Sequence, residues 1–453
     1  MVSQGFLPSR FTLASVLSAC SKLLDGVTGM RCHGTAVKTG LDKNIFVGNA
    51  LLSMYAKCGL MVDHGVRVFE SLSGPNEVSF TAVINGLARE DKVLEAVHMF
   101  RSMREKGVKV DSVCLSNILS ISAPREECDS SNETYCNVMG KQIHSLALRL
   151  GLEGDLHLNN SLLEVYAKSK DMNGAELVFG EMPEVNVVSW NIMIAGFGQE
   201  YRSDKSVEYL KRMRESGFEP NEVTCISVIG ACFRSGDFET GQGIFSCMPH
   251  RSVVAWNALL SGYSKYEHYE EAINHFRQMQ FENLKPDRTT LSVILSSCAK
   301  LRLLEGGKQV HGVAIRTNMS KNSHVVSGLI AVYSECEKME ISECIFDDCI
   351  AELDIACWNS MIAGSCSRLC SLLHGRQFHG QVVKSGYVSD SFVETALTDM
   401  YCKCGEIDSA REIFDTVLIK NTVLWNEMIH GVRKTPGRSW ITESNNWTRD
   451  CRK

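Results

Sequence analysis

Four stretches of the chain have nearly the same amino-acid sequence, and this repetition constrains the fold more than any other feature. They read VVSWNIMIAGFGQ from Val187, VVAWNALLSGYSK from Val253, IACWNSMIAGSCS from Ile355 and TVLWNEMIHGV from Thr422. Their starting points are 66, 102 and 67 residues apart. A repeat of about 20 to 50 residues is typical of solenoids built from one supersecondary element, whereas a chain of 453 residues would otherwise divide into several globular domains.

The period divides almost the whole chain. Residues 10–421 are predicted to form an array of about twelve repeats, at 10–44, 45–76, 77–111, 112–155, 156–186, 187–221, 222–252, 253–287, 288–322, 323–354, 355–390 and 391–421. A partial repeat at 422–432 follows. Residues 1–9 are expected to be the end of a truncated repeat, with no targeting peptide visible in MVSQGFLPSR, and residues 433–453 an aberrant, disordered tail.

Each repeat has the pattern of two helices and a break. In the repeat 187–221 the apolar residues Trp190, Met193, Ile194 and Phe197 follow helical spacing, and Val207, Leu210 and Met213 form a second stripe before Gly217 and Pro220 end it. Neither helix can bury its stripe alone, so neighbouring repeats must stack. The predicted fold class is therefore all-α, a right-handed superhelical solenoid of stacked helix-turn-helix repeats with one concave groove.

Composition excludes several classes of protein. No run of eighteen apolar residues could span a bilayer, so we expect no membrane partner. The 19 cysteines are an odd number, follow no secretory signal and often occupy helical core positions, which favours reduced thiols over a disulfide framework. The net charge of -6 gives no support to binding of nucleic acid by charge alone, so such binding must rest on base contacts.

The repeats alternate among three types. Repeats of the first type end in LKPD at Asp287 or VKVD at Asp111. Repeats of the second type combine SVLSAC with GMRCH at His33 or SVILSSC with GKQVH at His311, or carry GKQIH at His144. The short repeats read NALLSMYAKCG, NSLLEVYAKSK and TALTDMYCKCG. From residue 1 to about 432 the sequence resembles the pentatricopeptide repeat family. The three repeat types resemble the P, L and S motifs of its plant organellar PLS subclass. The pattern of the tetratricopeptide repeat, the nearest rival, is absent.

Two segments depart from the family pattern. The repeat 112–155 contains the insert PREECDSSNETYCNV, which we expect to be a loop between its two helices. The repeat 355–390 begins as a P motif at WNSMIAG and ends as an L motif at LLHGRQFHGQVVKSG, as if about one repeat were missing near Gly364. Its length is still that of one repeat, so this hybrid is expected to form two stacked helices.

The resemblance implies that RNA is read one base per repeat by two side chains, the fifth residue of a repeat and its last. The asparagine after each tryptophan is such a fifth residue. Asn and Thr are poor helix formers, which an interior helix position tolerates if the side chain faces a polar groove. The alternative is that these side chains only satisfy backbone groups between repeats, and it stays open here.

The last residue allows an argument about base identity. A carboxylate accepts only, which suits the ring N–H of guanine or uracil, whereas an amide can also donate, which suits adenine or cytosine. The resemblance adds that Thr as fifth residue favours purines and Asn pyrimidines. Thr81 with Asp111 then reads G, Asn257 with Asp287 reads U, Thr395 with Asn421 reads A, and the pairs Asn49 with Asn76, Asn160 with Asn186 and Asn191 with Asn221 read pyrimidines, preferably C. Ile226 with Ser252 has no evident code, and Ala14, Ser116 and Ser292 stay unassigned.

Several histidines and cysteines lie close together in the sequence, but their spacing is not that of a metal site. The spacings of Cys366, Cys370, Cys402 and Cys404, with His374 and His379 nearby, do not supply two matched ligand pairs. His33, His144, His311 and His379 recur at one motif position, which indicates packing. Neither HSL at His144 nor HGV at His311 has the glutamate of the H-x-E signature of zinc deaminases. We expect no metal, no cofactor, no small-molecule substrate and no catalysis.

These observations favour a sequence-specific adaptor that binds single-stranded organellar RNA in a mitochondrion or chloroplast. Its expected task is recognition of sites for C-to-U editing, with a deaminase or other editing factor acting in trans. Two alternatives remain open. One is a helical-repeat scaffold for protein partners, and the other is a truncated form that binds nothing.

Overall fold

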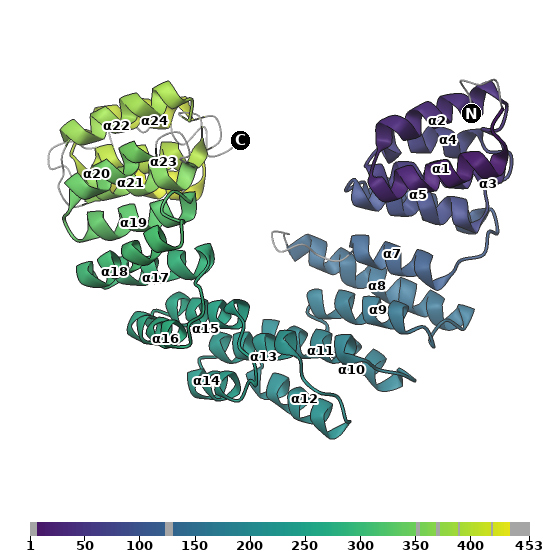
Figure 1. Ribbon diagram of the computed structural model, residues 1–453, viewed down its shortest axis with the longest axis horizontal. Coiled ribbons are helices and arrows are strands. Elements are labelled where there is room, and N and C mark those ends of the chain that lie inside the picture. Colours follow the sequence, from purple (N-terminus) through teal and green to yellow (C-terminus); the bar gives the residue numbers. More distant parts are fainter. Residues whose placement is uncertain are drawn as a thin grey trace. The chain divides into compact units, whose positions relative to one another are not determined.

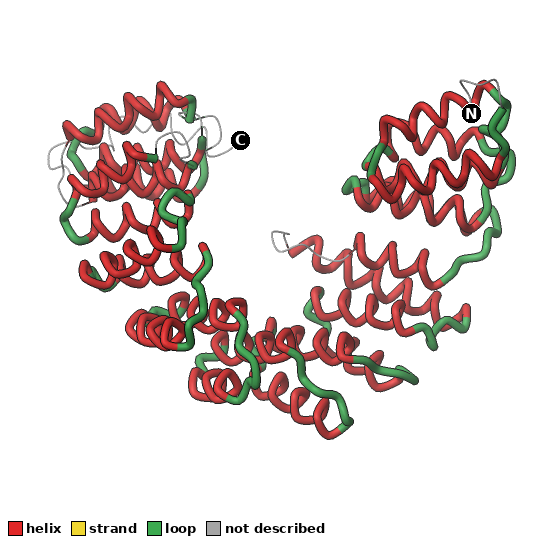
Figure 2. The backbone as a smooth tube through the Cα atoms, viewed as in Figure 1, coloured by secondary structure: helices red, strands yellow, loops and turns green. Residues whose placement is uncertain are grey.

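The computed structural model describes residues 7–122, 130–349, 354–367, 372–387, 390–417 and 420–434. Every regular element in these ranges is a helix (Figures 1 and 2). The predicted all-α class is therefore confirmed. None of these helices combines the length and the hydropathy that crossing a membrane requires.

The chain forms two compact parts, residues 1–241 and 242–453, which we call the N-terminal and C-terminal parts. The N-terminal part contains α1 (Arg10–Leu23), α2 (Gly26–Lys38), α3 (Ile45–Cys58), the π-helix η2 (Met61–Gly65), α4 (Val66–Ser71), α5 (Glu77–Arg89), α6 (Val93–Glu105), α7 (Ser112–Ser122), α8 (Ser130–Leu150), α9 (Leu156–Lys168), α10 (Met172–Glu181), α11 (Val187–Gln199), α12 (Ser203–Glu215) and α13 (Glu222–Arg234). Helix α14 (Phe238–Ser246) includes the boundary. The C-terminal part continues with α15 (Val253–Lys265), α16 (Tyr269–Phe281), α17 (Arg288–Lys300), α18 (Leu304–Arg316), α19 (Ser323–Glu335), α20 (Met339–Asp348), α21 (Ile355–Ser367), α22 (Leu372–Ser385), α23 (Ser391–Lys403), α24 (Ile407–Thr416) and α25 (Thr422–Lys434).

Within each part the first helices of successive repeats pack against one another. In the N-terminal part these are α1, α3, α5, α7, α9, α11 and α13, and in the C-terminal part α15, α17, α19, α21, α23 and α25. A second helix such as α6, α12 or α16 packs against its own first helix and against the first helix of the next repeat. The core is thus continuous along each stack, with large side chains such as Phe80, Phe197 and Trp256 fully buried between helices.

The last residue of a repeat is the N-cap of the first helix of the next repeat. At all but one of the described boundaries, its side-chain oxygen accepts a hydrogen bond from a backbone N–H of the first turn (Ser9, Asn44, Asn76, Asp111, Asp155, Asn186, Asn221, Ser252, Asp287, Asp354, Asp390 and Asn421). Asn322 lacks this bond. These residue types are the preferred helix N-caps, which explains why the first helices begin at the first residues of the repeats.

The insert in the repeat 112–155 is helical where it is described. Residues 123–129 lie outside the described residues, but from Ser130 onward the chain belongs to α8, a helix of 21 residues. The prediction of a loop is therefore wrong for residues 130–138. Two side chains hold this part of α8 to the next repeat: Asn137 donates to Asp171 at 3.3 Å, and Lys141 pairs with the same carboxylate at 2.9 Å. These contacts connect the end of the insert and the following turn of α8 to the next repeat, which the sequence of the insert alone does not indicate.

The hybrid repeat forms two helices, α21 and α22. Helix α21 packs against α19 and α23, and α22 packs against α21 and α23. The Phe346 ring lies against Trp358 and Phe378, with centroid distances of 4.8 and 5.9 Å, so both helices contribute to one core. Residues 368–371 lie outside the described residues, as do residues 1–6 of the truncated repeat and 435–453 of the predicted tail.

Gly364, where we placed the join, is packed closely against the preceding repeat. A Cβ atom at this position would lie 2.5 Å from the Cβ and Oγ atoms of Ser334 on α19. We expect Gly364→Ala to lower the free energy of unfolding by about 1 to 3 kcal/mol because α19 and α21 must move apart. Gly380→Ala, at an open position of α22, is the control and should stabilise by roughly 0.5 to 1 kcal/mol. Equal melting temperatures for the two variants would contradict this packing.

Candidate nucleic-acid interface

The predicted fifth and last residues come together in space. Asn49 donates through Nδ2 to Asn76 Oδ1 at 3.2 Å, and Asn160 donates to Asn186 at 3.5 Å. Asn257 donates to both carboxylate oxygens of Asp287, at 3.0 and 3.1 Å. Each fifth residue lies on a first helix, and each partner is the cap of the next first helix. The structure thus joins three of the six predicted pairs by direct hydrogen bonds across a repeat boundary.

A hydroxyl group completes these pairs and was not predicted. Thr290 Oγ1 donates to Asn257 Oδ1 at 2.6 Å and also approaches Asp287 Oδ1 at 2.9 Å. The equivalent residues are Ser79 beside Asn49, Ser189 beside Asn160 and Thr224 beside Asn191, at 2.6, 2.7 and 2.6 Å. In each case this residue also closes a capping box. The hydroxyl donates to the amide oxygen of the asparagine. This bond orients the NH₂ group of the asparagine toward the last residue of the repeat in three of the four repeats.

These contacts bear on the alternative that the side chains serve only the backbone. The last residues do have a backbone role, because their side chains cap helices. The asparagines at the fifth positions do not: Asn49, Asn160 and Asn257 bond the side chains of a cap and of a hydroxyl residue. The pairs are therefore preorganised clusters of polar side chains.

Asp287 keeps acceptor capacity. Its Oδ1 accepts from the Thr290 N–H at 2.9 Å and from Asn257, and its Oδ2 accepts from Asn257. The carboxylate also accepts from the Thr289 N–H, and the Thr290 hydroxyl, which donates to Asn257, lies 2.9 Å from Oδ1. Burial acts to raise the pKa of Asp287, but the bonds from Thr290 and Asn257 outweigh it and hold the pKa below its ordinary value. The carboxylate is therefore ionised at neutral pH and can accept one further N–H.

The two threonine pairs are arranged differently. Thr81 has a buried hydroxyl without a hydrogen-bond partner among the described residues, and Asp111 accepts from the Cys114 N–H at 2.7 Å. Thr395 donates to the Ser391 carbonyl of its own helix, and Asn421 caps α25 through the Leu424 N–H. No direct bond joins either pair. Asn191 reaches Asn221 only through Thr224, which bonds both.

An apolar side chain is exposed at the second residue of many first helices. In the N-terminal part these residues are Phe11, Phe46, Val78, Val113, Val188 and Val223, and in the C-terminal part Val254, Phe392 and Val423. Val254 is 63% exposed and Phe392 71%. In the successive repeats of α1 and α3 the Phe11 and Phe46 ring centroids are 5.7 Å apart. Helical periodicity does not place these residues in the core. An apolar residue at such an exposed position is therefore a signal of a binding surface, and the sequence analysis did not use it.

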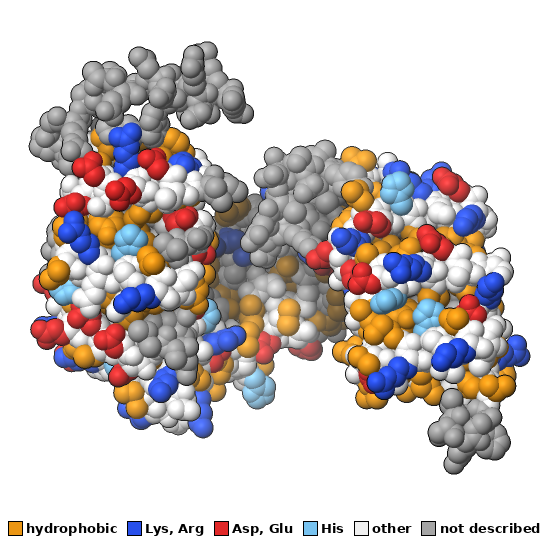
Figure 3. Space-filling view, turned by 90° about the horizontal axis from the view of Figure 1, so that it is seen from above, with side chains coloured by type: hydrophobic (Ala, Val, Ile, Leu, Met, Phe, Trp, Pro, Cys, Tyr) orange, Lys and Arg blue, Asp and Glu red, His pale blue; other side chains and the backbone are white. Residues whose placement is uncertain are grey.

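Basic side chains occupy the last turn of most first helices. They are Lys22, Lys57, Arg89, Lys168 and Arg234 in the N-terminal part and Lys265, Lys300 and Lys403 in the C-terminal part. Lys168 pairs with Glu164 at 2.8 Å and Lys403 with Asp399 at 2.6 Å. On the face shown in Figure 3 basic and acidic side chains are interspersed. The net charge of -6 therefore does not exclude an ordered set of cations at the ends of the first helices.

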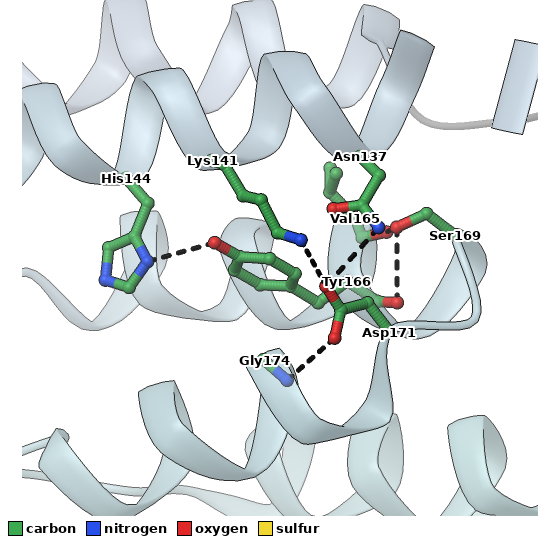
Figure 4. Close-up of polar contacts among 8 residues, drawn as sticks. All are labelled: Asn137, Lys141, His144, Val165, Tyr166, Ser169, Asp171 and Gly174. Atoms are coloured by element: carbon green, nitrogen blue, oxygen red, sulfur yellow. Dashed lines mark hydrogen bonds and ion pairs between the residues drawn. The ribbon is translucent and has the colours of Figure 1, made fainter. Parts of the chain in front are cut away.

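Four histidines form the same contact with a tyrosine of the following repeat. His33 bonds Tyr55 at 2.8 Å, and the pairs His144 with Tyr166, His311 with Tyr333 and His379 with Tyr401 have distances of 3.1, 3.0 and 2.9 Å. Figure 4 shows the second pair beside the Lys141–Asp171 contact. Among the described residues, no group of three or more His, Cys, Asp or Glu could hold a metal ion. Cys366 and Cys370 have no described side chains.

These histidines predict a loss of stability in mild acid. Burial lowers the pKa of His33, His144, His311 and His379. As pH falls below the ordinary value of about 6.5, the unfolded chain takes up protons more readily than the folded chain, and the free energy of unfolding decreases. Urea denaturation at pH 7.5 and 5.5 should show this decrease, and a variant with all four histidines replaced by glutamine should lose most of it. An equal decrease in both proteins would assign the effect to other groups.

Comparison with known proteins identifies the repeats. A model described as PPR repeat family matches residues 75–120, 185–234 and 251–300, and one described as PPR repeat matches 160–187, 223–253 and 395–420. A pentatricopeptide repeat-containing protein of Arabidopsis thaliana, At4g20770, is 78% identical over 95% of this chain. The chain is a pentatricopeptide repeat protein. It spans 60% of the length of that relative.

Three further matches show lower sequence identity. An Arabidopsis relative named mitochondrial is 28% identical over 88% of this chain and 41% of its own length, and one named chloroplastic is 28% identical over 87% and 56%. The crystal structure of the pentatricopeptide repeat protein PPR10 from maize matches 95% of this chain and 67% of its own, with a TM-score of 0.59 and 18% identity, which shows the shared fold.

Proposed function

We propose that this pentatricopeptide repeat protein binds single-stranded RNA sequence-specifically, one base per repeat. The observation that carries the proposal is the recurring cluster of fifth residue, last residue and hydroxyl, of which Asn257, Asp287 and Thr290 are the clearest example. These side chains come from different repeats, yet they converge at the boundaries that follow Asn76, Asn186 and Asp287. A cluster that served the fold alone would not need both an ionised acceptor and an oriented amide.

The Asn257–Asp287 cluster fits uracil. The free lone pairs of Asp287 accept the ring N–H of the base, and the oriented NH₂ group of Asn257 donates to a neighbouring carbonyl. Where the last residue is Asn186 or Asn76, an amide faces the base and its NH₂ group suits the ring nitrogen of cytosine. The guanine assigned to Thr81 and Asp111 and the adenine assigned to Thr395 and Asn421 follow the same acceptor and donor logic.

Two further features support an RNA ligand. The exposed apolar side chains at the second positions, such as Val223 and Val254, offer surfaces on which bases stack. The basic side chains eight residues farther along the same first helices as the fifth residues are placed to neutralise phosphates, about 12 Å away along the helix. Stacking, base contacts and phosphate contacts then occupy successive positions on one helix surface.

The resemblance to the family supports a proposal for the biological role. We infer that the protein acts in a mitochondrion or chloroplast, because relatives carry those names, and that it marks sites for C-to-U editing. Deamination itself is assigned to a partner enzyme in trans, because the Asn, Asp, Ser and Thr side chains of these clusters are not the His and Cys ligands and the catalytic Glu that zinc deaminases use. Membership of the PLS subclass, inferred from the alternating motifs, is part of the same proposal.

A duplex competition tests the proposal. Binding of a labelled single-stranded RNA is measured by fluorescence anisotropy, and then binding of the same RNA annealed to its complement at the same salt concentration. We expect the duplex to bind at least about tenfold more weakly, because base pairing occupies the groups that the clusters contact. Equal affinity for both forms would mean that the protein recognises only the phosphate backbone. A chain that binds neither form would favour the protein scaffold instead.

A further inference from the structure

A cavity of about 580 Å³ opens between the second helices of two successive repeats, 45–76 and 77–111, in the N-terminal part. On α6 its lining residues are Glu95, His98, Met99 and Ser102, whose spacing is that of one stripe of a helix. The opposite wall consists of residues of η2 and α4. None of the predicted fifth or last residues lines this cavity, so its residues are not those of the base-reading clusters. We call it the α4–α6 groove.

The α4–α6 groove combines apolar and acidic side chains. Val66 and Met99 are partly exposed along its walls, and Leu87 of α5 adds a buried apolar side chain. Glu70 and Glu95 are exposed at the groove, and among the described residues neither forms an ion pair. No lysine or arginine of the described part of the chain lines it. An occupant with apolar anchors and positive charges would therefore complement both components.

A one-residue insertion distinguishes one wall of the groove. Tyr55 and Phe69 are 14 residues apart, whereas the matching pairs are 13 apart in the repeats 156–186, 323–354 and 391–421 (Tyr166 and Phe179, Tyr333 and Phe346, Tyr401 and Phe414). The structure accommodates the extra residue in the π-helix η2, where the N–H groups of Met61 and Val62 donate to the Glu90 carboxylate, at 3.0 Å for Val62. Val62 lines the groove and is 41% exposed. Single π-turns within helices occur frequently at functional sites.

We propose that the α4–α6 groove docks an amphipathic helix of a protein partner, with an apolar face and lysine or arginine side chains at its edges. A helix that binds in a groove presents anchors at i, i+3, i+4 and i+7, and the stripe on α6 covers the same two turns. The carboxylates of Glu70 and Glu95 then pair with the basic side chains, and Val62 and Met99 contact the apolar face. This inference goes beyond RNA binding and does not depend on it.

A labelled peptide tests the proposal. It has about 16 residues, enough for four helical turns, with leucine at i, i+3, i+4 and i+7 and lysine beside them. Its binding to the full chain is measured by fluorescence anisotropy at one salt concentration. Saturable binding is expected, and a peptide of the same composition without a single apolar face should bind at least about tenfold more weakly. The joint substitution Glu70→Lys and Glu95→Lys should weaken binding of the first peptide about tenfold.

Matched variants separate the groove from general charge. Glu181→Lys combined with Glu239→Lys makes the same change in charge at exposed positions of α10 and α14, and should alter binding by less than about twofold. Met99→Ala removes an apolar contact from the groove and should weaken binding about fivefold. Leu94→Ala, at a position that is 71% exposed and does not line the groove, should leave the affinity unchanged.

Three results would overturn the proposal. Equal weakening by the two double glutamate variants would assign peptide binding to the total charge of the protein. A chain that shows no saturable binding of the peptide would not have this occupant. A concentration-dependent dimer in sedimentation, which the peptide dissociates and the variant of Glu70 and Glu95 does not form, would make a second copy of this chain the occupant.

Discussion

Asp287→Asn is expected to move the base preference of its repeat from uracil to cytosine, with a change of roughly ten- to a hundredfold in relative affinity. The substitution replaces an ionised acceptor by a group that can donate, so the ring N–H of uracil loses its partner and the ring nitrogen of cytosine gains one. Asparagine is an equally good N-cap, so the helix start should not be affected. RNAs that are identical except at one base are compared by anisotropy at a fixed salt concentration.

The matched control makes the same chemical change at another cap. Asp25 caps the second helix α2 through the Thr28 N–H and is not the last residue of a repeat. Asp25→Asn should leave base preference unchanged. The corresponding swap at Asp111 should move preference from guanine to adenine. If Asp287→Asn and Asp111→Asn weaken every RNA equally, these residues only cap helices, and the base assignments are wrong.

The second large effect concerns the salt dependence of RNA affinity. Replacement of Lys57, Arg89, Lys265 and Lys300 by glutamine removes four cations from the last turns of first helices. If each neutralises one phosphate, the slope of log affinity against log salt should become shallower by about 2.8, and affinity at 0.1 M salt should fall roughly 10²- to 10³-fold. Base preference should persist, because the base-reading clusters are intact.

The control for this experiment removes the same charge elsewhere. Arg31, Arg101, Lys211 and Arg277 are exposed on the second helices α2, α6, α12 and α16. Their replacement by glutamine should change the slope by less than one unit. Equal loss of affinity in the two quadruple variants would show that the protein attracts RNA through its total charge and not through this set of residues.

The repeated sequence predicted the fold well because the last residue of a repeat both marks the period and caps the next helix. Asn186 ends a repeat and caps α11, so the same position that sets the period also sets the start of a helix. The prediction of a loop before residue 139 was wrong for residues 130–138 for the opposite reason. Its polar residues favour a loop locally, whereas contacts such as that of Asn137 with Asp171 involve another repeat and cannot be predicted from the segment itself.

The interface was predicted only in part. The resemblance supplied the positions of Asn257 and Asp287, but a single sequence does not show that Thr290 orients the asparagine, because a threonine three residues after a cap reads as an ordinary capping box. No hydrogen bond joins Thr81 and Asp111, and Cys114 stands three residues after the cap, where Thr290 supplies a hydroxyl in the cluster of Asn257 and Asp287. Reading of guanine by this pair stays a prediction.

The central claim is that successive repeats read successive bases, and selection from a pool of random single-stranded RNA tests it most directly. The repeats assigned to G, U and A begin at residues 77, 253 and 391, so U is five repeats from G and A is four repeats from U. The selected RNAs should therefore contain a guanine and a uracil five nucleotides apart, an adenine four nucleotides beyond the uracil, and pyrimidines at the positions of the repeats beginning at 45, 156 and 187. A pool that is not enriched, or whose common motif lacks these intervals, would contradict the account.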